Sequence, residues 1–367
     1  MSEKYKFTDP VKGEVYWPIS VIPPYSLKIN PGLDILAGSP KVRYDMFFSS
    51  YKKNNLVRSY RIPGFKEIDS FILQKNEVRA IPFSDQLDYS PATDPKNSGK
   101  VVPFIIAISD EYTFKNKVTK QDLFEVNSIR YDHIPLIVYF KNSRVIIKNF
   151  DLKTYNKKIG YIIGAGDKVP EALEQMGYDV TMLTDKELSR NNLQQFDAII
   201  TGVRAYNTND WMNKYYDKLM KYVNDGGNFI VQYNNTQFRG GQPKIGPYNF
   251  TIANKRITDE NADVVFLKPE HPVVNFPNKI TQDDFKGWIQ ERSTYHATNF
   301  DKTNFETIFS MHDAGEASDE GSLIISKYGK GYFTYTGLVF FRELPAGVPG
   351  AYRLLANIIA LNKKKAF

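Results

Sequence analysis

The side chains that could contact a ligand follow the ends of short apolar runs in the second half of the chain. Carboxylates, amides and guanidinium groups hydrogen-bond hydroxyl and anionic groups, and aromatic rings offer stacking faces, so this set favours recognition of a ligand. Among these residues, Arg204 and Arg292 would hold anionic or hydroxyl groups, and Trp288 would offer the stacking face. We predict that the ligand site is bordered by Gly166, Asp167, Arg204, Tyr206, Tyr233, Asn234, His271, Trp288, Glu291 and Arg292.

One short segment brings three of these groups together along the chain. Trp288, Glu291 and Arg292 supply an aromatic ring, a carboxylate and a guanidinium group within five residues. One interpretation is sugar binding, in which the sugar stacks on the ring and the charged groups bind its hydroxyls. The other is a tryptophan that anchors a loop beside a Glu–Arg pair. Both interpretations stay open.

The sequence offers no clear centre for covalent catalysis. It contains no cysteine, which excludes a thiolate nucleophile, a thiolate metal site and disulfide bonds. The turn after Asn228–Gln232 also lacks the Gly-x-Ser-x-Gly pattern of a serine nucleophile. We therefore predict no catalytic residue and no cofactor. A competing hypothesis is a hydrolase that uses Asp167, His271 and Glu291 as acid, base or metal ligands.

The four histidines do not form a recognisable metal motif, because none has the i, i+4 spacing of a helical zinc site. Solvated or structural roles are favoured, and we predict no metal ligand. The alternative that stays open is a zinc site assembled in space from His271, His296, His312, Asp313 or Glu316.

A sheet of parallel strands must position these side chains. Ile159–Ile163, Ala198–Thr201 and Asn228–Gln232 are apolar runs without polar alternation, as in strands buried on both faces. Pro170 stands where the first helix would begin, and Gly177 where it would end. This pattern predicts a doubly wound α/β domain, which binds ligands beyond the carboxyl ends of its strands. Further predicted elements are strands at Val180–Leu183 and Gly331–Thr336 and helices at Asp210–Val223 and Ala351–Leu361.

The order of these elements resembles the class I glutamine amidotransferase-like group of flavodoxin-type domains. In that group a tight turn carries the nucleophile after the strand that corresponds to Asn228–Gln232, and Tyr233 occupies that place here. A tyrosine in place of an activated nucleophile gives triad chemistry no basis. The resemblance therefore implies a flavodoxin-like fold that is inactive as an amidotransferase.

The first part of the chain has short β-type runs separated by Pro, Gly and Asn. Examples are Tyr25–Ile29, in which apolar and polar residues alternate, Val42–Ser49 and Val78–Phe83. Strands spaced in this way predict an antiparallel β-sandwich. We therefore predict a β-sandwich domain at residues 1–153 and an amidotransferase-like α/β domain at residues 158–367, an α/β plus all-β protein.

Composition and charge narrow the range of partners. The net charge of +7 comes from scattered basic residues rather than a dense stripe, which argues against nucleic-acid binding. No apolar stretch reaches the roughly 18 residues that a membrane span needs. Gly164-Ala165-Gly166-Asp167 lacks the third glycine of a dinucleotide fingerprint. The first residues have no apolar signal core, so either the protein is cytoplasmic or the sequence begins inside a longer chain.

Several long stretches resemble the C-terminal region of bacterial PIG-L (LmbE-like) deacetylase family proteins, and the resemblance covers most of the chain. They are IGYIIGAGDKVPEAL, DAIITGVRAYNT, LKPEHPVVNFPNKIT, FKGWIQERSTY and YTGLVFFRELPAGVPGAYRLLANI, with YKFTDPVKGEVYWPISVIPP and IRYDHIP in the first part.

This resemblance implies an accessory role. In that family, zinc-dependent removal of an acetyl group from an N-acetylated amino sugar belongs to a separate N-terminal domain with an AHPDD-type metal motif. This sequence has no such motif. The resemblance thus implies a non-catalytic region for glycan recognition or scaffolding, with a glycan or amino-sugar ligand and a deacetylase domain in the same or a partner chain. It also implies a periplasmic or extracellular location.

Overall fold

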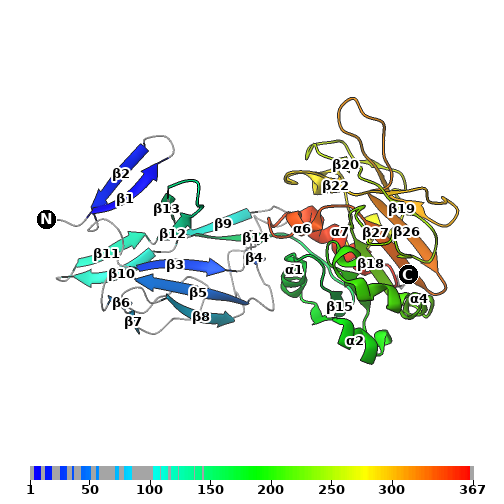
Figure 1. Cartoon of the computed structure of the whole chain (residues 1–367), viewed down its shortest axis with the longest axis horizontal. Helices are drawn as coiled ribbons and strands as arrows, with labels where there is room; N and C mark the ends of the chain where they lie inside the picture. Colours follow the sequence, from blue (N-terminus) through cyan, green and yellow to red (C-terminus); the bar gives the residue numbers. More distant parts are fainter. Residues whose placement is uncertain are drawn as a thin grey trace. The chain divides into compact units, whose positions relative to one another are not determined.

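The computed structural model describes residues 130–135 and 150–363 throughout, and describes the strands that precede residue 150 by their backbone. The chain divides into two compact units, Met1–Asn149 and Phe150–Phe367. In Figure 1 the first unit runs from blue to cyan and the second from green to red.

The first unit consists of strands in small, mostly antiparallel sheets. Two of these sheets have three strands each, in the orders β3-β5-β8 and β4-β14-β9, and β4 pairs parallel with β14. The strands are β1 (Lys4–Asp9), β2 (Gly13–Pro18), β3 (Tyr25–Asn30), β4 (Ile35–Leu36), β5 (Arg43–Ser50), β6 (Asn55–Val57), β7 (Phe71–Leu73), β8 (Val78–Ser84), β9 (Val102–Ala107), β10 (Ser109–Phe114), β11 (Lys117–Asp122), β12 (Phe124–Ile129), β13 (Ile137–Asn142) and β14 (Arg144–Asn149).

The strand predictions for Tyr25–Ile29, Val42–Ser49 and Val78–Phe83 are confirmed to within one residue. These runs correspond to β3, β5 and β8, which pair antiparallel in one sheet. Side chains alternate between the two faces of such strands, which explains the alternating pattern in the first of them. The protein is therefore a mixed α/β chain that contains small antiparallel sheets.

The second unit is built on a mixed seven-stranded sheet with the order β16-β15-β17-β18-β27-β26-β24. The five strands from β16 to β27 pair parallel, and β26 pairs antiparallel with both β27 and β24. Every residue of β17 and β18 is buried, as expected of central strands covered on both faces. The bounds are β15 (Lys158–Ile162), β16 (Asp179–Met182), β17 (Ala198–Thr201), β18 (Asn228–Gln232), β24 (Glu306–Thr307), β26 (Leu323–Tyr328) and β27 (Gly331–Thr336).

Helices and short strand pairs surround this sheet (Figure 1). The helices are α1 (Val169–Gln175), α2 (Asp185–Arg190), α3 (Ala205–Thr208), α4 (Tyr216–Asn224), α5 (Pro272–Asn275), α6 (Phe340–Glu343) and α7 (Pro349–Ile359), with 3₁₀ turns η4 (Leu193–Gln195), η5 (Asp210–Tyr215) and η6 (Gln282–Phe285). The long segment between β18 and β26 also holds three antiparallel pairs. They are β19 (Thr251–Ile252) with β23 (Ala297–Thr298), β20 (Arg256–Ile257) with β22 (Ser293–Thr294), and β21 (Val265–Phe266) with β25 (Phe309–Ser310).

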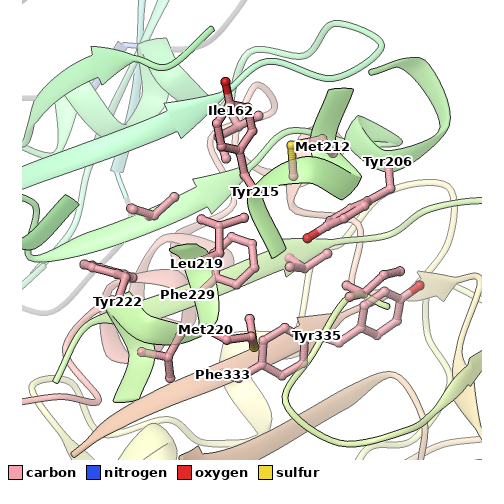
Figure 2. Packing of buried hydrophobic residues seen from close by; sticks show 14 of the residues in the cluster. Ile162, Tyr206, Met212, Tyr215, Leu219, Met220, Tyr222, Phe229, Phe333 and Tyr335 are labelled. Carbon is pink, nitrogen blue, oxygen red and sulfur yellow. The ribbon is translucent and has the colours of Figure 1, made fainter. Parts of the chain in front are cut away.

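A large apolar core lies on one face of the sheet (Figure 2). Leu219 of α4 belongs to it together with Phe229 of β18 and Phe333 of β27, whose rings lie 5.9 Å apart. Burial of each such side chain contributes roughly 1.5 to 3 kcal/mol. Helix α7 covers the opposite face of the sheet. The side chain of Asn228 in β18 points toward this face, where its amide nitrogen donates to Ile358 O of α7 at 2.7 Å. The sheet is therefore a middle layer between helices.

Most predicted elements of this unit agree with the structure. Strands β17, β18 and β27 have the predicted bounds, and α7 begins two residues before Ala351. The predicted helix at Asp210–Val223 differs, because its first part is the 3₁₀ turn η5 and only the rest is α-helical. Asn209, the residue before it, does not cap the turn, since its Nδ2 donates to Ile163 O at 2.6 Å instead.

Candidate functional site

Asp167 links the loops that follow β15 and β17 by hydrogen bonds. Its Oδ1 accepts hydrogen bonds from the Tyr161 hydroxyl at 2.6 Å and from Val169 N at 3.0 Å. Its Oδ2 accepts one from Val203 N at 3.1 Å. Burial, and then the charge of Asp167, raise the pKa of Tyr161 well above its ordinary value, so the hydroxyl stays a donor. Both carboxylate oxygens of Asp167 therefore accept hydrogen bonds that hold these loops together.

The same two loops approach each other closely enough to require glycine. Ala165 N donates to Val203 O at 2.8 Å. A Cβ on Gly164 would lie 2.0 Å from Val203 O, and one on Gly202 would lie 2.8 Å from Gly164 N. These contacts are far below van der Waals separation, so the carboxyl edge of the sheet has this shape only with both glycines.

A cavity of about 350 Å³ opens beside the first loop. Gly166 and Asp167 border it, and it is lined by none of the other predicted site residues. Glu171 and Glu174 add two carboxylates to its wall, and Glu171 is paired with Lys168 at 2.7 Å. The acidic wall does not suit an anionic ligand.

An aromatic and charged cluster lies at the carboxyl end of the central strand β18. The ring of Tyr233 is half-buried and stacks on the ring of Tyr295, with centroids 5.6 Å apart and planes 9° apart. Phe341 contacts it from another side, with centroids 5.2 Å apart. The backbone holds Arg204 beside it, because Arg204 N donates to Tyr233 O at 2.8 Å. We name as the Tyr233 cluster the residues Arg204, Tyr233, Glu291, Tyr295, Phe341 and Arg342.

Two guanidinium groups and one carboxylate carry the charges of this cluster. Arg342 Nε lies 3.1 Å from Glu291 Oε1, and its guanidinium lies 4.9 Å from the ring centroid of Phe341. Burial raises the pKa of Tyr233, and the charges of Arg204 and Arg342 oppose this rise. Both guanidinium groups are thus close enough to act on the Tyr233 hydroxyl. The structure therefore brings the predicted residues Arg204, Tyr233 and Glu291 together.

Unusual backbone conformations are concentrated at this cluster. Arg204 has φ 60°, Tyr295 has φ 50°, and Gln290, which precedes Glu291, has φ 68°. Residues with a Cβ seldom adopt this left-handed region, and bulky side chains do so least. Such conformations are found preferentially at binding and catalytic sites, where the surroundings hold them in place. Three of the five non-glycine residues with positive φ in the described part of the chain thus lie in this cluster or next to it.

Tyr206 and Asn234 lie beneath the cluster as supports. Tyr206 N donates to Asn234 Oδ1 at 2.9 Å, and Asn234 Nδ2 donates to Gln232 O at 3.1 Å. Both side chains are buried, and Tyr206 belongs to the apolar core shown in Figure 2. Their contacts fix the loop after β17 to the end of β18.

His271 lies elsewhere, at the start of α5. Its Nδ1 accepts a hydrogen bond from Val273 N at 3.1 Å, which caps that short helix. Its Nε2 is 3.9 Å from Glu306 Oε1. Burial lowers the pKa of His271, and Glu306 opposes the shift. A neutral capping imidazole is the state that this setting favours.

Trp288 and Arg292 are buried in the protein rather than presented to a ligand. Trp288 is 3% exposed, its indole donates to Asp284 O at 2.9 Å, and its ring stacks on Phe285. The guanidinium of Arg292 donates to Ala262 O, at 3.2 Å from Nε and 3.0 Å from Nη2, and to Phe285 O. Of the two interpretations of this segment, a tryptophan that anchors a loop fits the packing. The stacking face predicted for Trp288 is covered here.

Glu343, which follows Arg342 in α6, is a buried acid whose burial the sequence did not indicate. Both of its oxygens accept from Ile289 N, each at 3.1 Å. Burial raises its pKa to about 8, against the opposing effects of that hydrogen bond and of the nearby Arg292 charge. No local motif could have identified it, because its position depends on α6 packing against the loop before β22.

A serine, a histidine and an aspartate also meet, in an arrangement that the sequence did not reveal. His296 Nε2 lies 2.7 Å from Ser293 Oγ, and His296 Nδ1 lies 2.6 Å from Asp319 Oδ1. Hydrogen bonds from His296 and Lys255 outweigh burial and hold the pKa of Asp319 well below its ordinary value. The geometry matches a hydrolase triad, but Ser293 and His296 are both 0% exposed. In this conformation the three residues form an internal hydrogen-bonded chain without access for a substrate.

The groups proposed for acid, base or metal chemistry have separate partners. Asp167 binds Tyr161, His271 faces Glu306, and Glu291 pairs with Arg342. Within residues 130–135 and 150–363, no group of three His, Asp or Glu side chains is placed to hold a metal ion. His296 is bound to Asp319, and His312 Nδ1 lies 3.0 Å from Asp313 O.

No protein-family model and no curated protein matches this chain. In the part of the chain that the structure describes, no helix is long and apolar enough to cross a membrane. Inference about function therefore depends on the site itself.

Proposed function

We propose that this chain is a glycan-recognition module and that the Tyr233 cluster is its ligand site. One observation carries the proposal: a half-buried, stacked tyrosine pair lies beside two guanidinium groups at the carboxyl end of the central parallel strand. Aromatic rings stack on the apolar faces of sugars, while guanidinium groups bind their polar substituents. Ligands of open α/β sheets bind at this same edge.

We further propose the finer fold and family assignments that the sequence suggested. The parallel order β16-β15-β17-β18 supports a flavodoxin-like interpretation of the second unit, and the antiparallel sheets support a β-sandwich for the first. Tyr233 follows β18 directly, where an amidotransferase-like domain carries its nucleophile. A stacked aromatic ring at that turn supports recognition in place of acyl transfer. On the resemblance to PIG-L family proteins, the module would serve a deacetylase domain in the same or a partner chain.

Glycan binding by purified protein tests the proposal directly. Against an array of N-acetylated and deacetylated oligosaccharides, Tyr233→Ala should weaken binding by about ten-fold, whereas Tyr233→Phe should bind almost as the unmodified protein does, because the ring is kept. Tyr155→Ala is the matched control, since that tyrosine is half-exposed and contacts Phe276 rather than the cluster. Equal binding by Tyr233→Ala and the unmodified protein would rule out this site. Absence of all glycan binding would favour a scaffold.

A second candidate function, hydrolysis, has the Ser293–His296–Asp319 geometry in its favour. It requires an opening motion that exposes Ser293. A fluorophosphonate probe, which reacts with activated serines, decides between the two. Labelling that disappears in Ser293→Ala, together with release of acetate from an acetylated sugar, would establish a hydrolase. The recognition proposal expects an unlabelled protein.

A further inference from the structure

The backbone of Arg204 is fixed on both sides of its α-carbon. Its N–H donates to Tyr233 O at 2.8 Å. Its carbonyl accepts from Asn207 N at 2.9 Å, from Thr208 N at 3.0 Å and from the Thr208 hydroxyl at 3.1 Å. These bonds hold the residue at φ 60°. The direction in which its side chain leaves the loop is therefore set by the fold.

The guanidinium of Arg204 differs in its surroundings from those of Arg292, Arg342 and Arg353. Its Nε is buried and has no hydrogen-bond acceptor among the described residues. By contrast, Arg292 donates to Ala262 O, Arg342 to Glu291, and Arg353 to Asp284 at 2.6 Å. A buried donor without a partner costs free energy, so it indicates a position that a ligand completes.

Charge within the cluster points the same way. Arg204 and Arg342 contribute two positive charges near the Tyr233 hydroxyl, and Glu291 contributes one negative charge, which is paired with Arg342. One positive charge is left over, and it belongs to Arg204. A guanidinium group binds carboxylate well because its parallel N–H groups match the two oxygens.

We propose that the Tyr233 cluster selects sugars that carry a carboxylate, such as uronic acids, and that Arg204 binds this group while the Tyr233 ring contacts the sugar face. The inference rests on the proposed glycan-recognition function and specifies its ligand class. A singly charged carboxylate fits one unpaired guanidinium better than a phosphate monoester, whose charge approaches two at neutral pH.

The test compares acidic oligosaccharides with neutral forms of the same backbone. Fragments of hyaluronan, polygalacturonate and alginate are measured by calorimetry beside their carboxyl-reduced counterparts, with dextran and dextran sulfate as a further pair. At least one acidic form should bind about ten-fold more tightly than its reduced form, and added salt should shrink this ratio. This comparison uses the unmodified chain and depends on no variant.

Variants then assign the selectivity to Arg204. Arg204→Asn keeps a residue that tolerates the left-handed backbone, and it should bring the acidic-to-neutral ratio to about one. Arg204→Lys should keep part of the ratio, because the charge remains without the fork. Arg239→Gln is the control, since that exposed side chain pairs only with Asp210 in the described part of the chain. Thermal unfolding checks that each variant is folded.

Each outcome has a distinct meaning. Tight binding of neutral and acidic forms alike, unchanged in Arg204→Asn, would overturn carboxylate selection and leave glycan recognition standing. Preference for dextran sulfate alone would also overturn it. Binding of no sugar of either kind would overturn both the inference and the proposed function.

Discussion

Glu343 shows how one buried side chain couples this fold to pH. Its pKa is raised to about 8 by burial, from an ordinary value of 4.5. Between these values the folded protein keeps a proton that the unfolded chain releases. The contribution of Glu343 to the free energy of unfolding must therefore fall as pH rises through this window, and become level above it.

We predict that Glu343 lowers the free energy of unfolding by an amount on the order of 3 kcal/mol between pH 5 and pH 8, and that Glu343→Gln removes this contribution. The reason is that glutamine stays neutral and so carries no desolvation cost at high pH. Urea unfolding at a series of pH values measures the effect. Glu316→Gln, at an exposed position, should keep the original slope. A Glu343→Gln profile with the same slope as that of the unmodified protein would contradict the prediction.

The sequence revealed least about which individual residues of the site lie close together in space. Arg204 and Tyr233 were predictable, because both follow parallel strands and such ends share one edge. Tyr295 and Phe341 were not, since Tyr295 reaches the cluster from the loop between β22 and β23 and Phe341 from the short helix α6, and no periodic pattern describes either. Trp288 misled for a related reason: its neighbours Glu291 and Arg292 suggested a binding set, whereas the loop turns its ring inward.

At the scale of elements, the loops after β15 and β17 must stay in close contact for the site edge to form. Gly164→Ala should lower the free energy of unfolding by roughly 3 kcal/mol or more, because its Cβ would meet the backbone oxygen of Val203. Gly241→Ala is the comparison. That glycine has open space around it and φ 93°, so it should cost only about 1 kcal/mol of strain. Similar stabilities for the two variants would mean that the loops can separate without penalty.

Strands were more predictable than the connections between them. The apolar runs that became β17 and β18 are buried on both faces, and their composition alone marks them. The pairing of β27 with β18 could not be predicted in this way, because no local feature of either strand specifies a neighbour so distant in the chain. The 3₁₀ start of the helix at Asp210 was not predicted either, and the side chain of Asn209 before it binds Ile163 O, a partner distant in the chain.

At the scale of the whole molecule, the first residues after the β-rich unit belong structurally to the second unit. Lys153 and Asn278 exchange two hydrogen bonds of 2.9 Å, and Arg353 Nε donates to Asp151 O at 3.0 Å. The ring of Phe150 lies 5.7 Å from that of Tyr352. The segment Phe150–Lys153 is thus attached along the surface of α7 and its neighbours.

We predict that a fragment beginning at Phe150 folds cooperatively and is more stable than one beginning at Lys158. The expected difference in free energy of unfolding is on the order of 3 kcal/mol, because the shorter fragment loses these hydrogen bonds and the ring contact. Chemical denaturation of both fragments measures it. A third fragment from Phe150 with Asn278→Ala should fall between them. Equal stability of the two original fragments would show that the segment contributes nothing.

The sheet order has a consequence for how a ribosome-bound chain reaches its native state. Until β27 has been synthesised, one edge of β18 lacks its neighbouring strand. In the folded protein β27 pairs with β18 at this edge, for example Tyr332 with Asn228, and the long segment that carries Tyr295 is synthesised between the two strands. An uncovered apolar edge of this kind invites pairing with other chains. Translation that stalls after β18 should therefore yield aggregates, whereas release after α7 should yield a chain that can close its own sheet.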